Sequence, residues 1–473
     1  MEPRTTYQVV AQSALYRRVW RWHFYAGLVC LPFLALMAAT GALYLYKDSI
    51  EGLVYAQLRT APDGPGAALS PETLVAKAVQ ALPGQPVRFN PPPTEGRSAE
   101  VGVRTGDGVV GVYLDPSTGR VLGTLPDSRR LMEVVKNLHS LMIVGKWANY
   151  WVEIVAGWAI VLVVSGVFLW WPRGRQGGVV SVRGRPAQRT WWRDLHAVTG
   201  AVAGSAILFL AVTGMPWSAF WGQQFGAITG KLGIGLPQYL FGPGPASSAP
   251  PSAGAAPLPW LIAQAPVPQS ALPDAGHAGH AGHGAHSAPE ATDPSGESER
   301  ASIGLDKALQ IFKGMGLPSG TPVMLPAGPR GTYSAVLFPD DVRSQRVVHL
   351  DRYSGAVLSD VGYANYGVAG RTIEWGINIH TGQQFGWINQ LVMLAACLSI
   401  ITLALTAVTM WWKRRPRGRL AAPAKREGDR AAAGALAVAA LLGIAYPLLG
   451  ASMLVALIVD VVIPKHWHER FGL

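Results

Sequence analysis

Four histidines flank long apolar segments of this sequence: His23, His139, His196 and His380. An ionisable side chain at the edge of a membrane span is costly and calls for a partner. A neutral imidazole can bind a metal through one ring nitrogen while the other nitrogen makes a hydrogen bond. Two imidazoles on facing helices can therefore ligate haem iron from both sides, and helix bundles are where such sites are built. Two pairs of this kind would carry electrons from one membrane face to the other.

The spacing around these histidines divides them into two matched sets. His23 and His196 each precede a Thr-Gly dipeptide by 17 residues. His139 and His380 each precede the first residue of a double tryptophan by 31 residues. The chain therefore reads as two copies of one unit, each with a span, an outer domain, a histidine segment and a second span.

Four apolar windows are long enough to cross about 30 Å of hydrocarbon. They cover 22–46, 150–171, 194–217 and 388–412. A further apolar stretch, 431–463, is too long for one upright helix, and Pro447 favours a helical hairpin over a single kinked helix. No cleavage site follows the first span, so we expect it to remain as a signal anchor.

Composition supports a membrane protein with soluble portions, because 49% of the residues are hydrophobic and only 14% are charged. Basic residues gather before the first span and in the loops 172–193 and 413–430. The positive-inside rule makes these segments cytoplasmic and places 47–149 and 218–387 outside. The net charge of +12 therefore reports topology and does not predict nucleic-acid binding.

This topology sets the depth of the histidines. The first and third spans run outward, so His23 and His196 form an inner pair near the cytoplasmic face. The second and fourth spans run inward, so His139 and His380 form an outer pair. We expect one haem at each pair. Basic side chains near the pairs could hold the haem propionates: Arg17, Arg18, Arg21, Arg189 and Arg193 inside, and Arg371 or Lys136 outside. Four glycines would let a flat macrocycle approach the backbone: Gly27, Gly41, Gly200 and Gly214.

Other residues that could bind metals carry weaker signals. A low-complexity insert at 243–298 contains four closely spaced histidines: His277, His280, His283 and His286. These either bind a soft or borderline metal ion weakly or only reflect the biased composition of the insert. His349 falls in a strand pattern and is interpreted as a surface residue. Cys30 and Cys397 lie inside apolar spans and are expected to be packing residues. The tryptophan pairs at 170–171 and 411–412 are interpreted as interfacial anchors.

The two outer segments predict two small α+β domains. In the first, a helix at 71–82 precedes strands at 99–106, 108–115 and 119–125. In the second, a helix at 303–312 precedes strands at 332–338, 345–351 and 355–361. Matching turns at 115–119 and 351–355 join the last two strands of each meander.

With these features, the chain resembles the PepSY-associated transmembrane family of iron-regulated bacterial inner-membrane proteins. The resemblance covers nearly all of the chain outside 243–298. It is carried by an ordered set of motifs: W20-R-W-H23 with T40-G41, L138-H139 with W170-W-P-R, L195-H196 with T213-G214, and I379-H-T-G-Q-Q-F-G386 with W411-W-K-R.

The resemblance implies a function. It implies b-type haem held by His23, His139, His196 and His380, PepSY-like periplasmic domains, and reduction of a ferric siderophore on the periplasmic side. Relatives fused to flavoprotein reductases imply a cytoplasmic electron donor. This chain contains no flavin or dinucleotide fingerprint, so its donor would be a separate protein or a quinol.

The expected fold is an α-helical membrane protein: a four-helix haem-binding bundle from two repeats, a C-terminal hydrophobic hairpin or kinked helix, and two PepSY-like domains. The expected order is 1–46 N-terminus and first span, 47–130 first outer domain, 131–171 histidine segment and second span, 172–193 loop, 194–217 third span, 218–380 second outer region, 381–412 fourth span, 413–430 loop, 431–463 C-terminal hydrophobic segment and 464–473 tail.

Alternative functions remain open at this level. The PepSY-like domains could make the protein a non-enzymatic sensor or regulator, and the histidine-rich insert leaves room for a copper reductase. A proton relay through the same histidines is also compatible with the pattern. A metal permease is disfavoured because the spans have almost no ionisable residues at mid-depth. For the reductase, four aromatic residues could form the outer docking surface: Trp147, Tyr150, Trp375 and Trp387.

Overall fold

The computed structural model describes residues 6–61, 67–172, 178–236, 263, 267–272, 302–415 and 433–462. The chain divides into two compact units. The membrane unit comprises Met1–Lys47, Val134–Phe225 and Gly376–Leu473, and the sheet unit comprises Asp48–Glu133 and Gly226–Trp375. The predicted insert histidines His277, His280, His283 and His286 lie outside the described residues.

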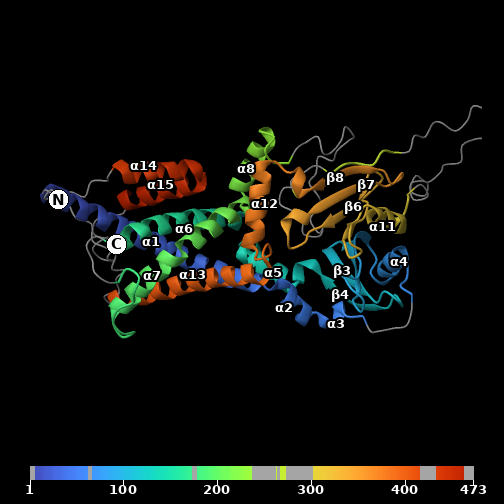
Figure 1. The fold of residues 1–473 in the computed structure, drawn as a ribbon, viewed down its shortest axis with the longest axis horizontal. Coiled ribbons are helices and arrows are strands. Elements are labelled where there is room, and N and C mark those ends of the chain that lie inside the picture. The colour runs from blue at the N-terminus through green and yellow to red at the C-terminus, as the bar shows by residue number, and fades with distance from the viewer. Residues whose placement is uncertain are drawn as a thin grey trace, which may run out of the picture. The chain divides into compact units, whose positions relative to one another are not determined.

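Four helices of the membrane unit are long and apolar enough to cross a membrane, counted within the described residues. They are α1 (Thr6–Tyr44), α6 (Asn149–Trp170), α7 (Arg189–Gly214) and α13 (Gly386–Arg414). The four predicted spans are thereby confirmed. α1 and α7 each pack against both α6 and α13, so the four helices close into a ring with α1 and α7 at opposite corners. Figure 1 shows the four helices lengthwise, running along the membrane unit.

The middle of the bundle is an apolar layer. Ala159 of α6 packs with Ala203 and Ile207 of α7, and larger apolar side chains of the other two helices complete the cluster. Gly204 lets α7 approach α6 closely, since a Cβ there would lie 3.3 Å from Val163 Cγ1. Small residues at helix contacts are how membrane helices gain packing contacts without a hydrophobic driving force.

Shorter helices lie at the ends of the spans. α5 (Leu131–His139) precedes α6, and α12 (Val368–His380) precedes α13. α8 (Trp221–Lys231) follows α7. α5 and α12 each end on one of the predicted histidines, so the two histidine segments are helical up to the histidine itself.

The C-terminal apolar stretch forms two helices, α14 (Ala433–Ala445) and α15 (Pro447–Val462), which pack against each other. The hairpin is therefore the observed alternative, and the break falls at Tyr446 because the proline after it begins a new helix. α15 docks on α6 where Leu449 is fully buried beside Gly157. Trp158 Nε1 also donates a hydrogen bond to Ser452 Oγ over 2.9 Å.

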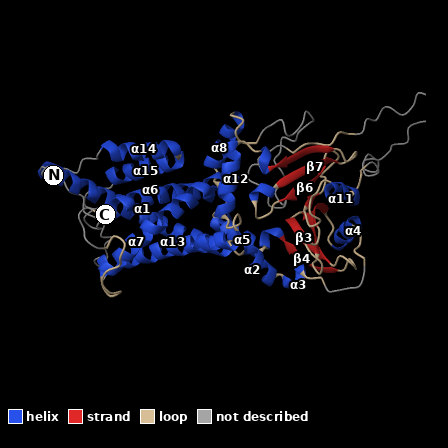
Figure 2. Cartoon of the chain, viewed as in Figure 1, coloured by secondary structure: helices blue, strands red, loops and turns tan. Residues whose placement is uncertain are grey.

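The sheet unit contains eight described strands in one antiparallel sheet of order β4-β3-β2-β1-β5-β6-β7-β8 (Figure 2). The strands are β1 (Gln85–Asn90), β2 (Ala99–Thr105), β3 (Gly108–Leu114), β4 (Val121–Pro126), β5 (Val323–Met324), β6 (Thr332–Leu337), β7 (Arg346–Asp351) and β8 (Val357–Gly362). Its helices are α2 (Lys47–Val54), α3 (Ala56–Arg59), α4 (Pro71–Ala81) and α11 (Leu305–Gly314).

The prediction of two separate outer domains is corrected by this sheet. Each half has four strands where three were predicted, and the additional strands β1 and β5 pair with each other at Phe89 and Val323. One hydrophobic core, built on strands of both halves and covered by α4 and α11, joins them. β5 has only two residues, which is too short for an alternation pattern to reveal.

The two predicted turns are confirmed. The side chain of Asp115 accepts hydrogen bonds from the backbone of Ser117, and that of Asp351 accepts them from Tyr353. Gly119 and Gly355 close the turns with positive φ angles of 70° and 72°. A left-handed backbone of this kind is readily adopted only by glycine.

The interpretation of His349 as a surface residue is wrong. The side chain is buried, and its Nδ1 lies 2.7 Å from Ser334 Oγ on the neighbouring strand. β7 is covered on both faces, so the residues that alternate with its core positions are buried as well. Burial lowers the pKa of His349 to about 4.

Candidate functional site

The structure brings His23 and His196 together inside the ring of four helices. Their ring centroids lie 6.5 Å apart and their ring planes are nearly perpendicular, at 89°. His23 is on α1 and His196 on α7, the two helices at opposite corners of the bundle. The predicted first pair therefore exists as two imidazoles that face each other across the bundle interior.

His139 and His380 form the second pair at the opposite ends of α1 and α7. His139 contacts α1 through Thr40, and His380 contacts α7 through Thr213. The two imidazoles are close enough to affect each other electrostatically: burial lowers the pKa of His380, and His139 lowers it further. Burial also lowers the pKa of His139, so both rings are favoured in the neutral form that binds metals.

Each of the four imidazoles is held by a hydroxyl on a neighbouring helix. The Nδ1-to-hydroxyl distances are 2.8 Å for His23 with Ser165, 3.0 Å for His139 with Thr40, 2.9 Å for His196 with Thr406 and 2.8 Å for His380 with Thr213. The intervals repeat: 26 residues separate His139 from Ser165 and also His380 from Thr406. The two halves of the chain thus build their histidine supports in the same way.

The direction of these hydrogen bonds follows from the second partner of each hydroxyl. Every one of the four hydroxyls donates to the carbonyl four residues earlier in its own helix, over 2.6–2.8 Å. A hydroxyl has one proton, so a hydroxyl that donates to this carbonyl accepts from the imidazole Nδ1–H. Each histidine is thereby held as the tautomer whose Nε2 has a free lone pair, which is the atom a metal would take.

Three of the four hydroxyls are followed by a glycine that makes room for a histidine ring. A Cβ at Gly41 or Gly214 would lie 3.5 Å from the Cε1 of His139 or His380, and one at Gly166 would lie 3.3 Å from that of His23. The fourth hydroxyl, Thr406, is followed by alanine.

The other two glycines predicted to face a macrocycle, Gly27 and Gly200, lie instead against the leucine side chains of Leu162 and Leu403.

The arginines predicted to hold propionates are placed as follows. Arg17 and Arg21 lie on α1 within two turns of His23, and the Arg21 guanidinium lies 5.3 Å from the centroid of the Tyr25 ring. Arg193 Nε donates to the fully buried Asp194 over 2.9 Å. Contacts of these arginines with propionates stay a prediction.

Sequence reasoning missed four polar residues of the bundle. Ser165 and Thr406 could have been found from their common interval to His139 and His380. Glu153 and Asp194 are single acids within candidate spans, and both are fully buried. Glu153 Oε2 accepts a hydrogen bond from the Trp221 backbone N–H over 2.9 Å, and Asp194 accepts from two arginines. These acids position helix ends and a loop around the bundle.

The two imidazoles of each pair fit haem iron better than a metal ion that is held by protein ligands alone. Among the described residues no three His, Cys, Asp or Glu side chains gather into a metal site. A structural zinc ion needs four protein ligands, whereas haem iron needs only the axial ones. The centroids of the His23 and His196 rings lie 6.5 Å apart, so one metal centre between the two rings could be within reach of both.

A comparison with models of known protein families shows to which family the chain belongs. The family model described as the PepSY-associated TM region matches residues 20–414. The chain belongs to this family. The match contains α6, α7 and α13 in full, α1 from residue 20 onward, and all four paired histidines, and it confirms the resemblance read from the sequence motifs. A search of curated proteins finds no match to the chain. The family and the four long apolar helices together make this a membrane protein.

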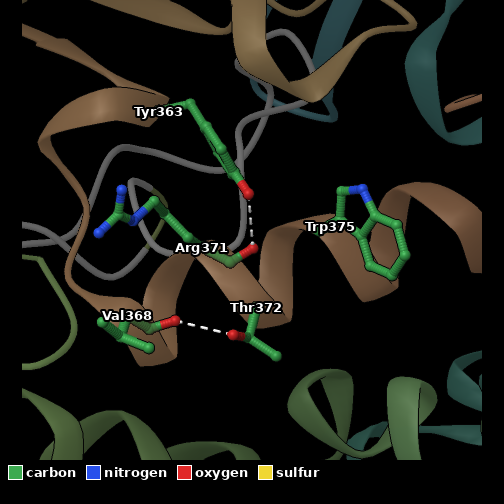
Figure 3. A pocket seen from close by; sticks show the side chains of 5 residues that line it. All are labelled: Tyr363, Val368, Arg371, Thr372 and Trp375. Atoms are coloured by element: carbon green, nitrogen blue, oxygen red, sulfur yellow. Dashed lines mark hydrogen bonds between the residues drawn. The ribbon is translucent and has the colours of Figure 1, made fainter.

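A second feature is an open depression of about 470 Å³ in the sheet unit, lined by one face of α12 and by Tyr363. Tyr363 donates from its hydroxyl to the Arg371 carbonyl over 3.1 Å, which fixes the ring over the helix. The Arg371 and Trp375 side chains extend on either side of it (Figure 3). Thr372 and Val368 complete the lining. The depression thus combines an exposed cation with two aromatic rings.

The histidine geometry predicts separable losses of haem. His23→Ala or His196→Ala should remove one of two haems per chain, because each change removes one of the two imidazoles that would hold the haem at the first pair. His139→Ala or His380→Ala should remove the other. Haem per protein, measured from the pyridine haemochrome spectrum, should fall by about half in each variant. His349→Gln changes a buried histidine outside the pairs and should keep the full content; loss of haem in this control alone would contradict the assignment.

Proposed function

We propose that this protein is a transmembrane dihaem reductase that delivers electrons across the bacterial inner membrane to a chelated Fe(III), such as a ferric siderophore. The observation that carries the proposal is the presence of two histidine pairs in one membrane bundle, each histidine with its Nδ1–H anchored and its Nε2 free. Haem b bound at each pair would supply one-electron redox chemistry.

The separation of the pairs suits transfer across a bilayer. α1 carries His23 of one pair and Thr40, the support of the other pair, 17 residues apart. At 1.5 Å per helical residue this is about 25 Å, close to the thickness of the hydrocarbon core. The packed layer of Ala159, Ala203 and Ile207 between the pairs excludes water, so electrons could cross where protons and ions could not.

The redox balance requires one electron for each iron. At the cytoplasmic side, a reduced flavoprotein would give electrons singly, or a quinol would give two electrons and release two protons for every two irons. At the periplasmic side, Fe(III) in the chelate becomes Fe(II). Hard oxygen ligands prefer Fe(III), so reduction loosens the chelate and serves as the release step.

The depression on α12 is the proposed docking face for the chelate. Arg371 is exposed, and its guanidinium can donate two parallel hydrogen bonds to the negatively charged oxygens of a hydroxamate, catecholate or carboxylate ligand. The rings of Tyr363 and Trp375 offer apolar contact for the organic part. α12 ends on His380, so the docking face and a histidine of the outer pair belong to one helix.

Electron delivery can be tested in a single turnover. Haem-loaded protein is reduced with dithionite, freed of excess reductant and mixed with a ferric siderophore in a stopped-flow spectrometer. The reduced haem bands should decay, and a ferrous chelator such as ferrozine should trap one Fe(II) for each electron lost. Protein with His380→Ala should keep one reducible haem but lose fast oxidation by the chelate. Haem that stays reduced in the presence of several ferric chelates would overturn the proposal.

The docking face has its own test. Arg371→Gln should raise the KM for anionic ferric chelates roughly tenfold, since a charge-assisted hydrogen bond contributes about 1.5–3 kcal/mol. The kcat and the haem spectrum should change little, because the substitution lies outside the bundle. Arg120→Gln removes an equivalent exposed charge from the β3–β4 turn and serves as the control. Equal KM values in both variants would place the docking site elsewhere.

A further inference from the structure

The four hydroxyls that hold the paired histidines form one repeated device, made of Thr40, Ser165, Thr213 and Thr406. Each device is a chain of two hydrogen bonds, from the imidazole Nδ1–H to the hydroxyl oxygen and from the hydroxyl proton to a helix carbonyl. Thr213 and Thr406 repeat the arrangement in the second half of the chain. Four occurrences with the same atoms and the same direction point to a common role.

Serine and threonine hydroxyls on helices commonly donate a hydrogen bond to a carbonyl of the preceding turn. α13 contains several such hydroxyls and also one that contacts a histidine as well. Ser399, Thr402 and Thr409 of α13 also donate to the carbonyl four residues earlier, over 2.7–2.8 Å, and all three are half-buried. Thr406, on the same helix, is almost fully buried and takes His196 as a second partner. The helix itself does not need that second bond, so its consequence lies with the histidine.

We propose that Thr40, Ser165, Thr213 and Thr406 are positioning residues that set the reduction potential of the haem iron at each pair. The inference rests on the proposed function, because it requires that the histidines ligate haem. A hydrogen bond accepted from Nδ1–H makes the imidazole a more basic ligand, which stabilises Fe(III) over Fe(II) and lowers the potential. A neutral hydroxyl lowers the reduction potential less than a carboxylate would, because it is a weaker hydrogen-bond acceptor.

The two pairs can be tuned independently, because their supports lie on different helices. The first pair is supported from α6 and α13, by Ser165 and Thr406. The second pair is supported from α1 and α7, by Thr40 and Thr213. A change of one hydroxyl should therefore shift the potential of one haem and leave the other unchanged, which a general loosening of the bundle would not do.

The experiment is a spectroelectrochemical titration of the purified, haem-loaded protein. Thr213→Val keeps the shape of the side chain but removes the acceptor, and should raise one midpoint potential. The expected size is about a tenfold change in the ratio of ferric to ferrous iron at fixed ambient potential, equal to ~59 mV for one electron. Thr213→Asp supplies a stronger acceptor and should lower the same midpoint. Thr213→Ser retains the hydroxyl and should restore the native value even where the other two variants bind haem poorly.

The matched control is Thr402→Val, which removes a hydroxyl that donates to the same kind of carbonyl on α13 but contacts no histidine. Thr406→Val, one helical turn away, should shift the other midpoint, while Thr402→Val should shift neither. The tuning role would be overturned if Thr213→Val and Thr406→Val kept full haem content and had the same midpoint potentials as the control. The reductase proposal would then still stand. Valine and aspartate variants that shift the midpoint in the same direction would also overturn it. Absence of haem from the native protein would instead overturn the proposed function itself.

Discussion

The hydrogen bond from each imidazole Nδ1–H to a hydroxyl of a neighbouring helix is the interaction on which the arrangement of the bundle depends. These bonds connect α1 with α6, α7 with α13, α5 with α1 and α12 with α7. A buried imidazole without a partner would carry the full cost of an unsatisfied polar group. When the hydroxyl proton goes to the carbonyl of its own helix, the imidazole Nδ1–H is the donor, and the lone pair of Nε2 is left available. The same contact thus satisfies the histidine, joins two helices and leaves the Nε2 atom available to a metal.

Duplication explains why this contact occurs four times and why the sheet unit is continuous. Each half of the chain contributes two bundle helices, two histidines, two hydroxyls and four strands. A four-stranded half alone would expose an edge strand and one side of its core. Pairing of Phe89 in β1 with Val323 in β5 removes that edge and merges the two cores under α4 and α11. In the membrane unit, the same duplication places α1 and α7 at opposite corners, so that their histidines face each other.

Much of this architecture could be predicted from the sequence, because the signals are long or repeated. The four spans follow from apolar length, the histidine pairs from equal intervals, and the two meanders from alternation and turn residues. The hydroxyl supports could not be assigned in the same way. Serine and threonine occur at several positions of α13, and only the folded bundle distinguishes Thr406, which contacts His196, from Thr402, which does not. The joining strand β5 is too short to show a pattern, and His349 was misjudged because both faces of its strand are buried.

The central claim is that two pairs of histidines each hold one haem, and it is tested most directly by low-temperature electron paramagnetic resonance of the oxidised, purified protein together with its haem content. The account predicts two haems per chain, and both should give the low-spin ferric signals of bis-histidine ligation. The two signals should be distinct enough to assign, because different helices set the ring planes of each pair. A colourless protein from haem-replete cells, or haem that is wholly high-spin and so lacks a second axial histidine, would contradict the account.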